Sequence, residues 1–402
     1  MEHVIIQKSH HRHQSSMRAM IAYGTFFAFF LFGWIGNMAG AAIPTILQEL
    51  RLTYSQVGIM FFGVSLGVFL ATLLIGPLAD IIGKKAVIFT SCGCFAAGIL
   101  GFSSFNTFGV LTASMFFIGL ALGSLEVGGH LIIVDLYPEN KGRYLNLLNF
   151  FYGVGSMLVP FYVGFLLSAN VSWRTIYRSG LPLVAVLFVY FLLIRPPQSS
   201  SSSSSAAFDW KHVGKTAFSG DMPAFYFIMM LYVAAELGTS TWMVEFLQKA
   251  KSQSVMTSSL FLSLFFGMMT VGRFVGSFVV ERIGYLKSMV FASFGAILCV
   301  AVGTFGPDSL AFVLPVSGLC YSIVFPTLTA TVSELHQENT GTILGLLFTF
   351  SGLGGMLGPW LIGVLSDWTT IRTGFGMITL FCMIVCITLF WLMKQPTLAK
   401  TR

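Results

Sequence analysis

One segment of the chain is repeated about half a chain length later. Residues 145–166 read LNLLNFFYGVGSMLVPFYVGFL, and residues 344–365 read LGLLFTFSGLGGMLGPWLIGVL. Eleven of the 22 aligned positions are identical, at an offset of 199 residues in a chain of 402. A repeat at this offset, inside apolar sequence, predicts a chain that arose by doubling a membrane bundle. Parallel halves related by an axis along the membrane normal are one architecture of secondary transporters.

The composition requires lipid as the main solvent. Hydrophobic residues make up 55% of the chain and charged residues 9%, whereas soluble domains carry about 25% charged residues. The net charge is +7, but the basic residues stand singly between apolar runs. We interpret them as loop residues that follow the positive-inside bias, and we expect no nucleic-acid partner.

Twelve apolar runs are long enough to cross a bilayer, which takes about 20 helical residues. The sequence therefore predicts an all-α integral membrane protein with two pseudo-symmetric six-helix bundles. The predicted spans are 18–47, 54–79, 86–105, 107–135, 142–169 and 178–195, and then 222–248, 255–280, 286–306, 308–334, 340–366 and 372–393.

The predicted domain organisation follows from these runs and from one low-complexity stretch of seven consecutive serines. A polyserine segment cannot pack, so it predicts a flexible tether between the bundles. The expected parts are a cytoplasmic leader (1–17), an N-terminal bundle (18–195), a Ser-rich cytoplasmic linker (196–220), a C-terminal bundle (221–394) and a cytoplasmic tail (395–402).

The distribution of Lys and Arg predicts the orientation. With the N-terminus in the cytoplasm, sixteen basic residues, Arg273 among them, fall on the cytoplasmic side and six on the outer side. The positive-inside bias then places both termini in the cytoplasm, in a multi-pass protein of the plasma membrane.

The segment between the second and third spans resembles a loop of the major facilitator superfamily. Residues 76–85 read GPLADIIGKK, similar to that family's Gly-x-x-x-Asp-x-x-Gly-Arg/Lys loop. Its glycines permit a tight turn, and its lysines suit the cytoplasmic surface. The second half has a degraded copy, ERIGY, at residues 281–285. The resemblance implies gating or structural roles for Asp80, Lys84, Glu281 and Arg282.

A narrower resemblance is to the fucose–galactose–glucose:proton symporter branch. The sequences GSLEVGGH at 123–130, LNLLNFFYG at 145–153 and YVAAE at 232–236, with Trp242 six residues later, are similar to spans 4, 5 and 7 of that branch. The branch carries an Asp in span 1, four residues before a Pro, where this chain has Gly40 before Pro44. A proton relay through two carboxylates in spans 1 and 4 is therefore not available.

Glu126 is the principal candidate for ion coupling, and both Glu126 and His130 are also candidates for substrate binding, since an ionised Glu126 can accept a hydroxyl group. A charge at the bilayer centre costs about 2.5–3.5 kcal/mol, so intramembrane carboxylates are by default functional. The repeat places Phe325 opposite Glu126, so this carboxylate belongs to one half only. His130 lies one turn further along the same helix face and could relay or tune a proton. A structural hydrogen bond for Glu126 and a buried core histidine for His130 are the alternatives.

Glu236 is the carboxylate expected at mid-membrane in the second half. It could accept hydroxyl groups of a substrate or bind the coupling ion. The threonines and serine at 239–241 could complete a polar pocket or a sodium site. Glu245 is nearer the outer surface, where we expect it to be solvated.

Amides and aromatic rings provide the remaining candidates for substrate binding. Amides offer both a donor and an acceptor, which suits polyols. The candidates at this depth are the amides of Asn37 and Asn149 and the phenol of Tyr152; hydrogen bonds between helices are the alternative. Rings that could stack on a sugar are Trp242, Tyr321 and Trp360, although core packing is an alternative for each of them.

The function predicted from these features is secondary active import of a sugar, a hexose or deoxyhexose, by alternating access. Protons or sodium would be the coupling ion, with no cofactor, no metal and a monomer in the bilayer. The alternatives are a proton-coupled exporter of amphiphilic compounds and a solute sensor that does not transport. No phosphate-binding loop or nucleophile–base pair is present in the sequence, so we expect no enzyme.

Overall fold

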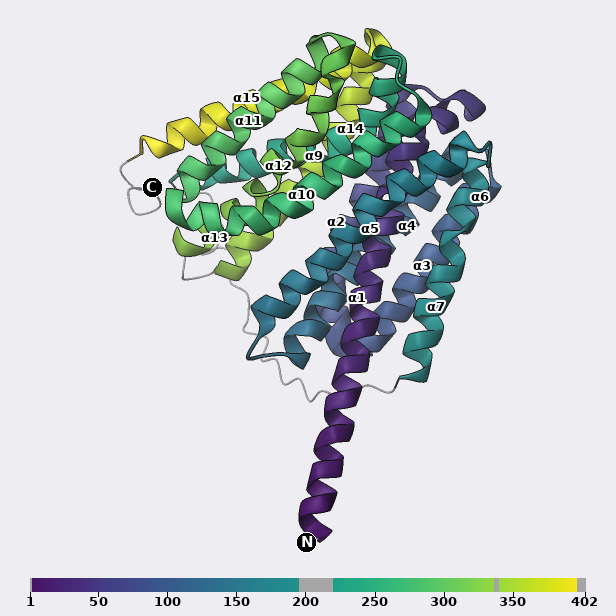
Figure 1. Ribbon diagram of the computed structural model, residues 1–402, viewed down its shortest axis with the longest axis vertical. Helices are drawn as coiled ribbons and strands as arrows, with labels where there is room; N and C mark the ends of the chain where they lie inside the picture. Colours follow the sequence, from purple (N-terminus) through teal and green to yellow (C-terminus); the bar gives the residue numbers. More distant parts are fainter. Residues whose placement is uncertain (1, 195–219, 336–339, 396–402) are drawn as a thin grey trace.

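The computed structural model describes residues 2–194, 220–335 and 340–395, and Figure 1 shows their arrangement. Helices account for nearly all of these residues, and no strand occurs among them. Twelve of the helical segments are long and apolar enough to cross a membrane. The predicted fold class is confirmed. Of the predicted linker 196–220, only Gly220 lies within the described part of the chain. The domain boundaries therefore remain a prediction.

The first six spans are formed by seven helices. They are α1 (Glu2–Leu50), α2 (Tyr54–Ile82), α3 (Lys84–Ser104), α4 (Phe108–Leu136), α5 (Lys141–Ser168), α6 (Trp173–Arg178) and α7 (Gly180–Leu193). Helices α6 and α7 together make the sixth span. Because α1 begins at Glu2, the predicted leader is continuous with the first span, and Figure 1 shows it projecting beyond the other helices.

The second six spans follow the same order. They are α9 (Met222–Ala250), α10 (Val255–Ile283), α11 (Tyr285–Phe305), a tenth span in three pieces, α14 (Thr340–Trp368) and α15 (Ile371–Met393). The three pieces are the 3₁₀-helix η1 (Asp308–Val316), α12 (Ser317–Tyr321) and α13 (Val324–Leu335).

The tenth span, predicted over 308–334 with bends expected at Pro326 and at three other intramembrane prolines, is broken. The break falls at Ser322 and Ile323, just before Pro326. A proline ring clashes with the carbonyl group four residues earlier, here that of Ser322, and removes one donor. By contrast, Pro44, Pro160 and Pro359 lie inside uninterrupted helices.

Glycines shared by the two copies of the repeat make equivalent contacts within each half. A Cβ atom on Gly155 of α5 would collide with the carbonyl oxygen of Phe30 on α1, and one on Gly354 of α14 would collide with that of Met230 on α9. In lipid, helices associate through such close backbone packing. The repeat therefore preserves the α5–α1 and α14–α9 contacts.

Other glycines of the repeat join the two halves. Gly153 and Gly164 of α5 contact Thr270 and Ser259 of α10, and their counterparts Gly352 and Gly363 of α14 contact α2. Figure 1 shows the two sets of helices side by side near α6 and the turn after α1, and apart near the N-terminus. We call these the convergent and the divergent ends. With the orientation predicted above, the divergent end faces the cytoplasm.

We predict that Gly155→Ala destabilises the protein, because an added methyl group must separate α5 from α1. Overpacking of this kind costs about 1–3 kcal/mol. The measurement is the apparent melting temperature of the purified protein in one detergent. Gly93→Ala in α3 is the control, since no atom lies within 4 Å of its added Cβ. Equal melting temperatures for the two variants would contradict the packing argument.

Candidate functional site

Glu236 lies on the face of α9 that meets the other half of the protein. One turn further along this face is Ser240, and a Cβ atom on Gly40 of α1 would lie 2.6 Å from the Ser240 carbonyl oxygen. Glu236 is half-buried. The carboxylate therefore stands near the junction between α1 and α9 and is not fully enclosed.

Polar side chains from both halves surround Glu236. Its electrostatic neighbours are Arg273 of α10 and Tyr232 of α9. Tyr152 of α5 interacts in turn with Arg273, Glu236 and Asn37 of α1. We refer to Asn37, Tyr152, Ser156, Glu236 and Arg273 as the polar cluster.

Hydrogen bonds fix the part of the polar cluster that lies in the first half. The Asn37 Nδ2 atom donates to Ser156 Oγ and to the Gly33 carbonyl oxygen, each at 3.0 Å. Ser156 Oγ donates to the Tyr152 carbonyl oxygen at 2.9 Å. Since α1 and α5 are also in close contact at Gly155, the Asn37 amide is held in place, and so is the helix that carries Tyr152.

Arg273 is a functional candidate that the sequence analysis missed. It was counted among the cytoplasmic cations, but it lies inside the membrane-spanning segment Val255–Gly276. Its Nη2 atom is 3.7 Å from Met269 Sδ, and none of the ion pairs within 4.0 Å among described residues includes it. The guanidinium group can therefore bind an acceptor on a ligand. An arginine inside the predicted span 255–280 was the signal for it.

Glu126 and His130 form a second, separate pair on α4. Leu122, one turn before Glu126, contacts Gly36 of α1, so Glu126 is on the side of α4 that faces α1. Its electrostatic neighbour is His130, whose Nδ1–H donates to the Glu126 carbonyl oxygen at 2.6 Å. The His130 ring is edge-on to Phe29, with centroids 5.2 Å apart. Both side chains are half-buried, so neither the carboxylate nor the imidazole, which lie within one turn of each other, is fully enclosed.

Asn149 lies on the same face of α5 as Tyr152 and Ser156, nearer the divergent end. It lies three and seven residues before Tyr152 and Ser156, which places the three side chains on one helix face. Asn149 is exposed, and its Nδ2 donates to the Leu145 carbonyl oxygen at 3.0 Å. Its carbonyl group remains able to accept from a ligand.

Two of the three rings proposed for stacking are packed in the core. Trp242 is 0% exposed, and its Nε1–H donates to the Pro359 carbonyl oxygen at 2.9 Å. Tyr321 is 2% exposed. Neither ring presents a face to a ligand in this conformation, so the stacking prediction is wrong for this state and the packing alternative applies. Trp360 is half-buried, with its backbone against Gly58.

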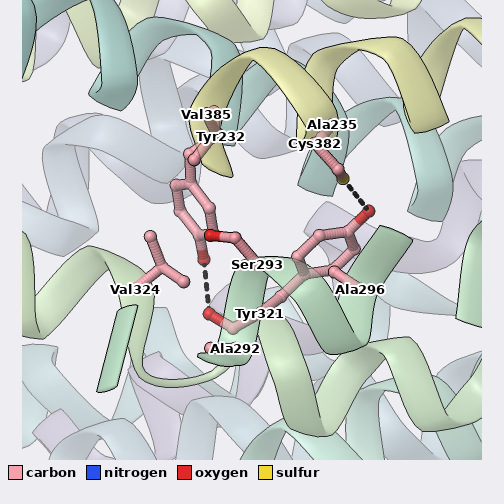
Figure 2. Close-up of a pocket in the computed structure, with 9 residues that line it drawn as sticks. All are labelled: Tyr232, Ala235, Ala292, Ser293, Ala296, Tyr321, Val324, Cys382 and Val385. Atoms are coloured by element: carbon pink, nitrogen blue, oxygen red, sulfur yellow. Dashed lines mark hydrogen bonds between the residues drawn. The ribbon is translucent and has the colours of Figure 1, made fainter. Parts of the chain in front are cut away.

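Tyr321 borders a small cavity inside the second half, shown in Figure 2. The cavity volume is about 10 Å³, room for about one water molecule. Tyr232 Oη donates to the Tyr321 carbonyl oxygen at 2.9 Å, and Tyr321 Oη lies 3.4 Å from Cys382 Sγ (Figure 2). The cavity is too small for a sugar. These contacts fix the ring of Tyr232, which is a neighbour of Glu236.

The residues predicted for gating lie at the divergent end. Gly83, which joins α2 to α3, has φ +85°, a conformation that favours glycine. Lys84 forms an ion pair with Asp135 at the end of α4. In the degraded copy, Tyr285 Oη donates to Glu334 Oε1 at 3.0 Å. Glu334 is 199 residues after Asp135, so a hydrogen bond from a phenol replaces the ion pair with a lysine.

Two other gating candidates, Glu281 and Arg282, form no comparable ion pair or hydrogen bond among the contacts of the described residues. Glu281 and Arg282 are exposed. The side chain of Asp80 lies outside the described residues, so its role remains a prediction.

Glu245 is buried, which contradicts the solvated role expected for it. Its exposure is 1%, and Tyr54 Oη donates to its Oε1 atom at 3.0 Å. Depth along α9 suggested a position near the surface, but α2 of the other half covers this carboxylate.

We predict that Glu236 and Arg273 stabilise each other, because unlike charges in a poorly solvated site attract. Glu236→Gln and Arg273→Gln should each lower the melting temperature, and the double variant should lose less than the sum. Both groups are half-exposed, so we expect a coupling of about 1 kcal/mol. The measurement is a double-mutant cycle of thermal unfolding in one detergent. If the losses in melting temperature of the two single variants simply add up in the double variant, the two side chains do not interact and the prediction is wrong.

Comparison with known proteins places this arrangement in a family. Residues 25–359 and 307–402 match the Major Facilitator Superfamily. Protein TsgA of Escherichia coli O17:K52:H18 (strain UMN026 / ExPEC) is 21% identical over 357 residues, which cover 85% of this chain and 87% of that protein. The glucose/galactose transporter of Brucella abortus biovar 1 (strain 9-941) is 24% identical over 379 residues, 87% of this chain and 88% of the relative.

Among solved structures, a mutant of the nucleoside transporter NupG has a similar fold. Its TM-score is 0.78 at 16% identity, covering 94% of this chain and 100% of NupG. The glucose/galactose relative confirms the resemblance drawn from spans 4, 5 and 7. With its twelve candidate spans, the chain is a multi-pass membrane transporter and not an enzyme. It belongs to the major facilitator superfamily.

Proposed function

We propose that this transporter imports a sugar, a hexose or deoxyhexose, by alternating access coupled to protons or sodium. The observation that carries the proposal is the polar cluster, in which side chains of both halves meet inside the membrane. A solute held there contacts both bundles, so its binding can bias their relative motion. The glucose/galactose relative supports the choice of a sugar.

The chemistry of the polar cluster suits a polyol. The Glu236 carboxylate accepts hydrogen bonds from hydroxyl groups, and the Arg273 guanidinium group donates to hydroxyl oxygens. Asn37 and Tyr152 each provide a donor and an acceptor. A hydroxyl group both donates and accepts, so a ring with several hydroxyls matches this mixed set better than an amphiphile does.

We assign ion coupling to Glu126 and His130. A coupling cation that moves inward gains about 2.3 kcal/mol per 100 mV, which corresponds to an accumulation of several tens-fold. The Glu126 carboxylate can bind that cation, and His130 on the same face can exchange a proton with it. In this assignment both termini are cytoplasmic, the protein works as a monomer in the plasma membrane, and the divergent end opens inward.

The decisive experiment is uptake into proteoliposomes under separately imposed proton and sodium gradients. The panel contains hexoses, deoxyhexoses, nucleosides and an amphiphilic cationic dye. Gradient-driven accumulation of a hexose or deoxyhexose supports the proposal. Accumulation of nucleosides alone, gradient-driven extrusion of the dye, or saturable binding without transport would each replace it.

We predict that Glu126→Gln abolishes uphill sugar uptake while counterflow exchange continues. Exchange needs only the loaded carrier to reorient, whereas accumulation needs a group that binds and releases the ion. The measurement compares both assays in the same proteoliposomes. The matched control is Glu139→Gln, which removes an exposed loop carboxylate and should leave both rates unchanged. Wild-type accumulation by the Glu126 variant would remove this residue from coupling.

We also predict that Glu236→Gln weakens sugar binding by about tenfold, because a hydrogen bond to a charged group contributes about 1.5–3 kcal/mol. Binding is measured by scintillation proximity in detergent, with dependence on pH and sodium followed in parallel. An unchanged affinity together with an unchanged ion response would exclude Glu236 from the site.

A further inference from the structure

Charged and polar groups fasten the two halves at the convergent end. The backbone N–H groups of Tyr54 and Ser55, at the start of α2, donate to the Asp367 carboxylate at 2.8 and 2.7 Å. The Tyr54 hydroxyl donates to Glu245 Oε1 of α9 at 3.0 Å. We call Tyr54, Ser55, Glu245 and Asp367 the latch. It connects one helix of the first half to two helices of the second.

Apolar packing closes the latch against water on its inner side. The Tyr54 ring meets Trp242 edge-on, with centroids 5.6 Å apart, and Trp242 is 0% exposed. Gly363 of α14 allows its helix to approach the Tyr54 backbone, because a Cβ atom there would lie 2.5 Å from the Tyr54 carbonyl oxygen. Glu245 itself is 1% exposed. The carboxyl group is therefore removed from water while the convergent end is closed.

The bonding of Glu245 is incomplete for an ionised carboxylate. Oε1 accepts from Tyr54, whereas Oε2 is buried without a hydrogen-bond partner. No ion pair within 4.0 Å among described residues includes Glu245. An uncompensated buried charge is strongly unfavourable, whereas a neutral carboxyl group with one unpartnered oxygen costs much less at the same place.

The surrounding charges do not change this conclusion. On α9, the nearest cation is Lys249, which is exposed and therefore screened. On α14, Asp367 adds a second negative charge near Tyr54. On α15, Arg372 donates to the Ala250 carbonyl oxygen at 2.9 Å. Lys251, after α9, donates to the Gly306 carbonyl oxygen.

The equivalent junction between α5 and α10 lacks these carboxylates. Ser168 stands 199 residues before Asp367, and its hydroxyl donates to the Gly164 carbonyl oxygen within α5. The start of α10 is capped by its own Ser254, which accepts from the Thr257 N–H at 3.0 Å. The duplicated scaffold thus closes by neutral packing at one junction and by carboxylates at the other.

We propose that Glu245 is a proton-binding site that controls closure of the convergent end. The halves close over Glu245 when it carries a proton, and they separate there when it has lost it. The closed latch then binds one more proton than the open one, so raising the pH favours opening at this end. For one proton the closed-to-open ratio changes by up to about tenfold per pH unit. The mechanism does not depend on which solute is transported.

Hydrogen–deuterium exchange of the full-length protein in nanodiscs tests the proposal between about pH 5 and 8, the range over which a buried carboxyl group can titrate. After correction for the intrinsic rate, exchange at the start of α2 should rise with pH in the wild type. Glu245→Gln, which keeps the shape of a neutral carboxyl group, should stay protected at every pH. Asp367→Asn weakens the other contact of the latch and leaves Glu245 in place. It should raise exchange throughout the range and retain the pH dependence.

Two results would overturn the proposal. One is exchange at the start of α2 that does not vary with pH in the wild type. The other is a Glu245→Gln variant that responds to pH as the wild type does. If that variant proves poorly folded, Tyr54→Phe replaces it, since loss of the phenol donor leaves both oxygens of Glu245 without a partner and should move opening to lower pH. An unchanged response in Tyr54→Phe would equally contradict the proposal.

Discussion

Close backbone contact between helices at glycine positions is the constraint on which the structure depends. In a bilayer, apolar side chains gain little by leaving lipid for protein, so helices associate through packing that small residues permit. Gly155 and Gly354 allow α5 and α14 to contact α1 and α9 within each half, while Gly164 and Gly363 allow the same two helices to contact α10 and α2 across the halves. One short repeated segment thus provides both kinds of contact, and these glycines are among its eleven identical positions.

The charged residues of the candidate sites do not follow the symmetry of the two halves. Glu126 and His130 have Phe325 and Thr329 as their counterparts at the 199-residue offset, and Asp367 has Ser168. A charged group inside the membrane is costly unless it is paired or has a function. Retaining each such group in only one half limits that cost, and it gives the two halves different roles. In the proposed function the first half provides Glu126 for coupling, while the second provides Glu236 and Arg273 for the solute and, as proposed above, the carboxylates of the latch.

The sequence predicted the helices well because span length and hydropathy are local properties. The twelve spans, the parallel halves and the shared face of Glu126 and His130 needed no knowledge of neighbours. The failures concern contacts between helices. Glu245 was expected in water because the sequence gives its position along the span, near the outer surface. The sequence does not show that Tyr54 covers its carboxylate. Trp242 and Tyr321 are residue types that can stack on a sugar, but only the packed structure shows that their rings are enclosed. Arg273 and the break near Pro326 were readable from the sequence, since an arginine inside an apolar run and a proline inside a predicted helix are both local signals.

Helix α9 connects the polar cluster to the latch. Glu236, Ser240 and Glu245 lie on one continuous helix, and nine residues at 1.5 Å per residue separate the two carboxylates by about 13 Å along the axis. Between them, the Ser240 carbonyl oxygen lies against Gly40 of α1, so α1 and α9 are in direct contact at this point. An aspartate at position 40, as in the related symporters, would hold the two helices apart there. Glycine at this position therefore exchanges a carboxylate in span 1 for direct contact between the halves, and the single helix α9 carries residues of both the polar cluster and the latch.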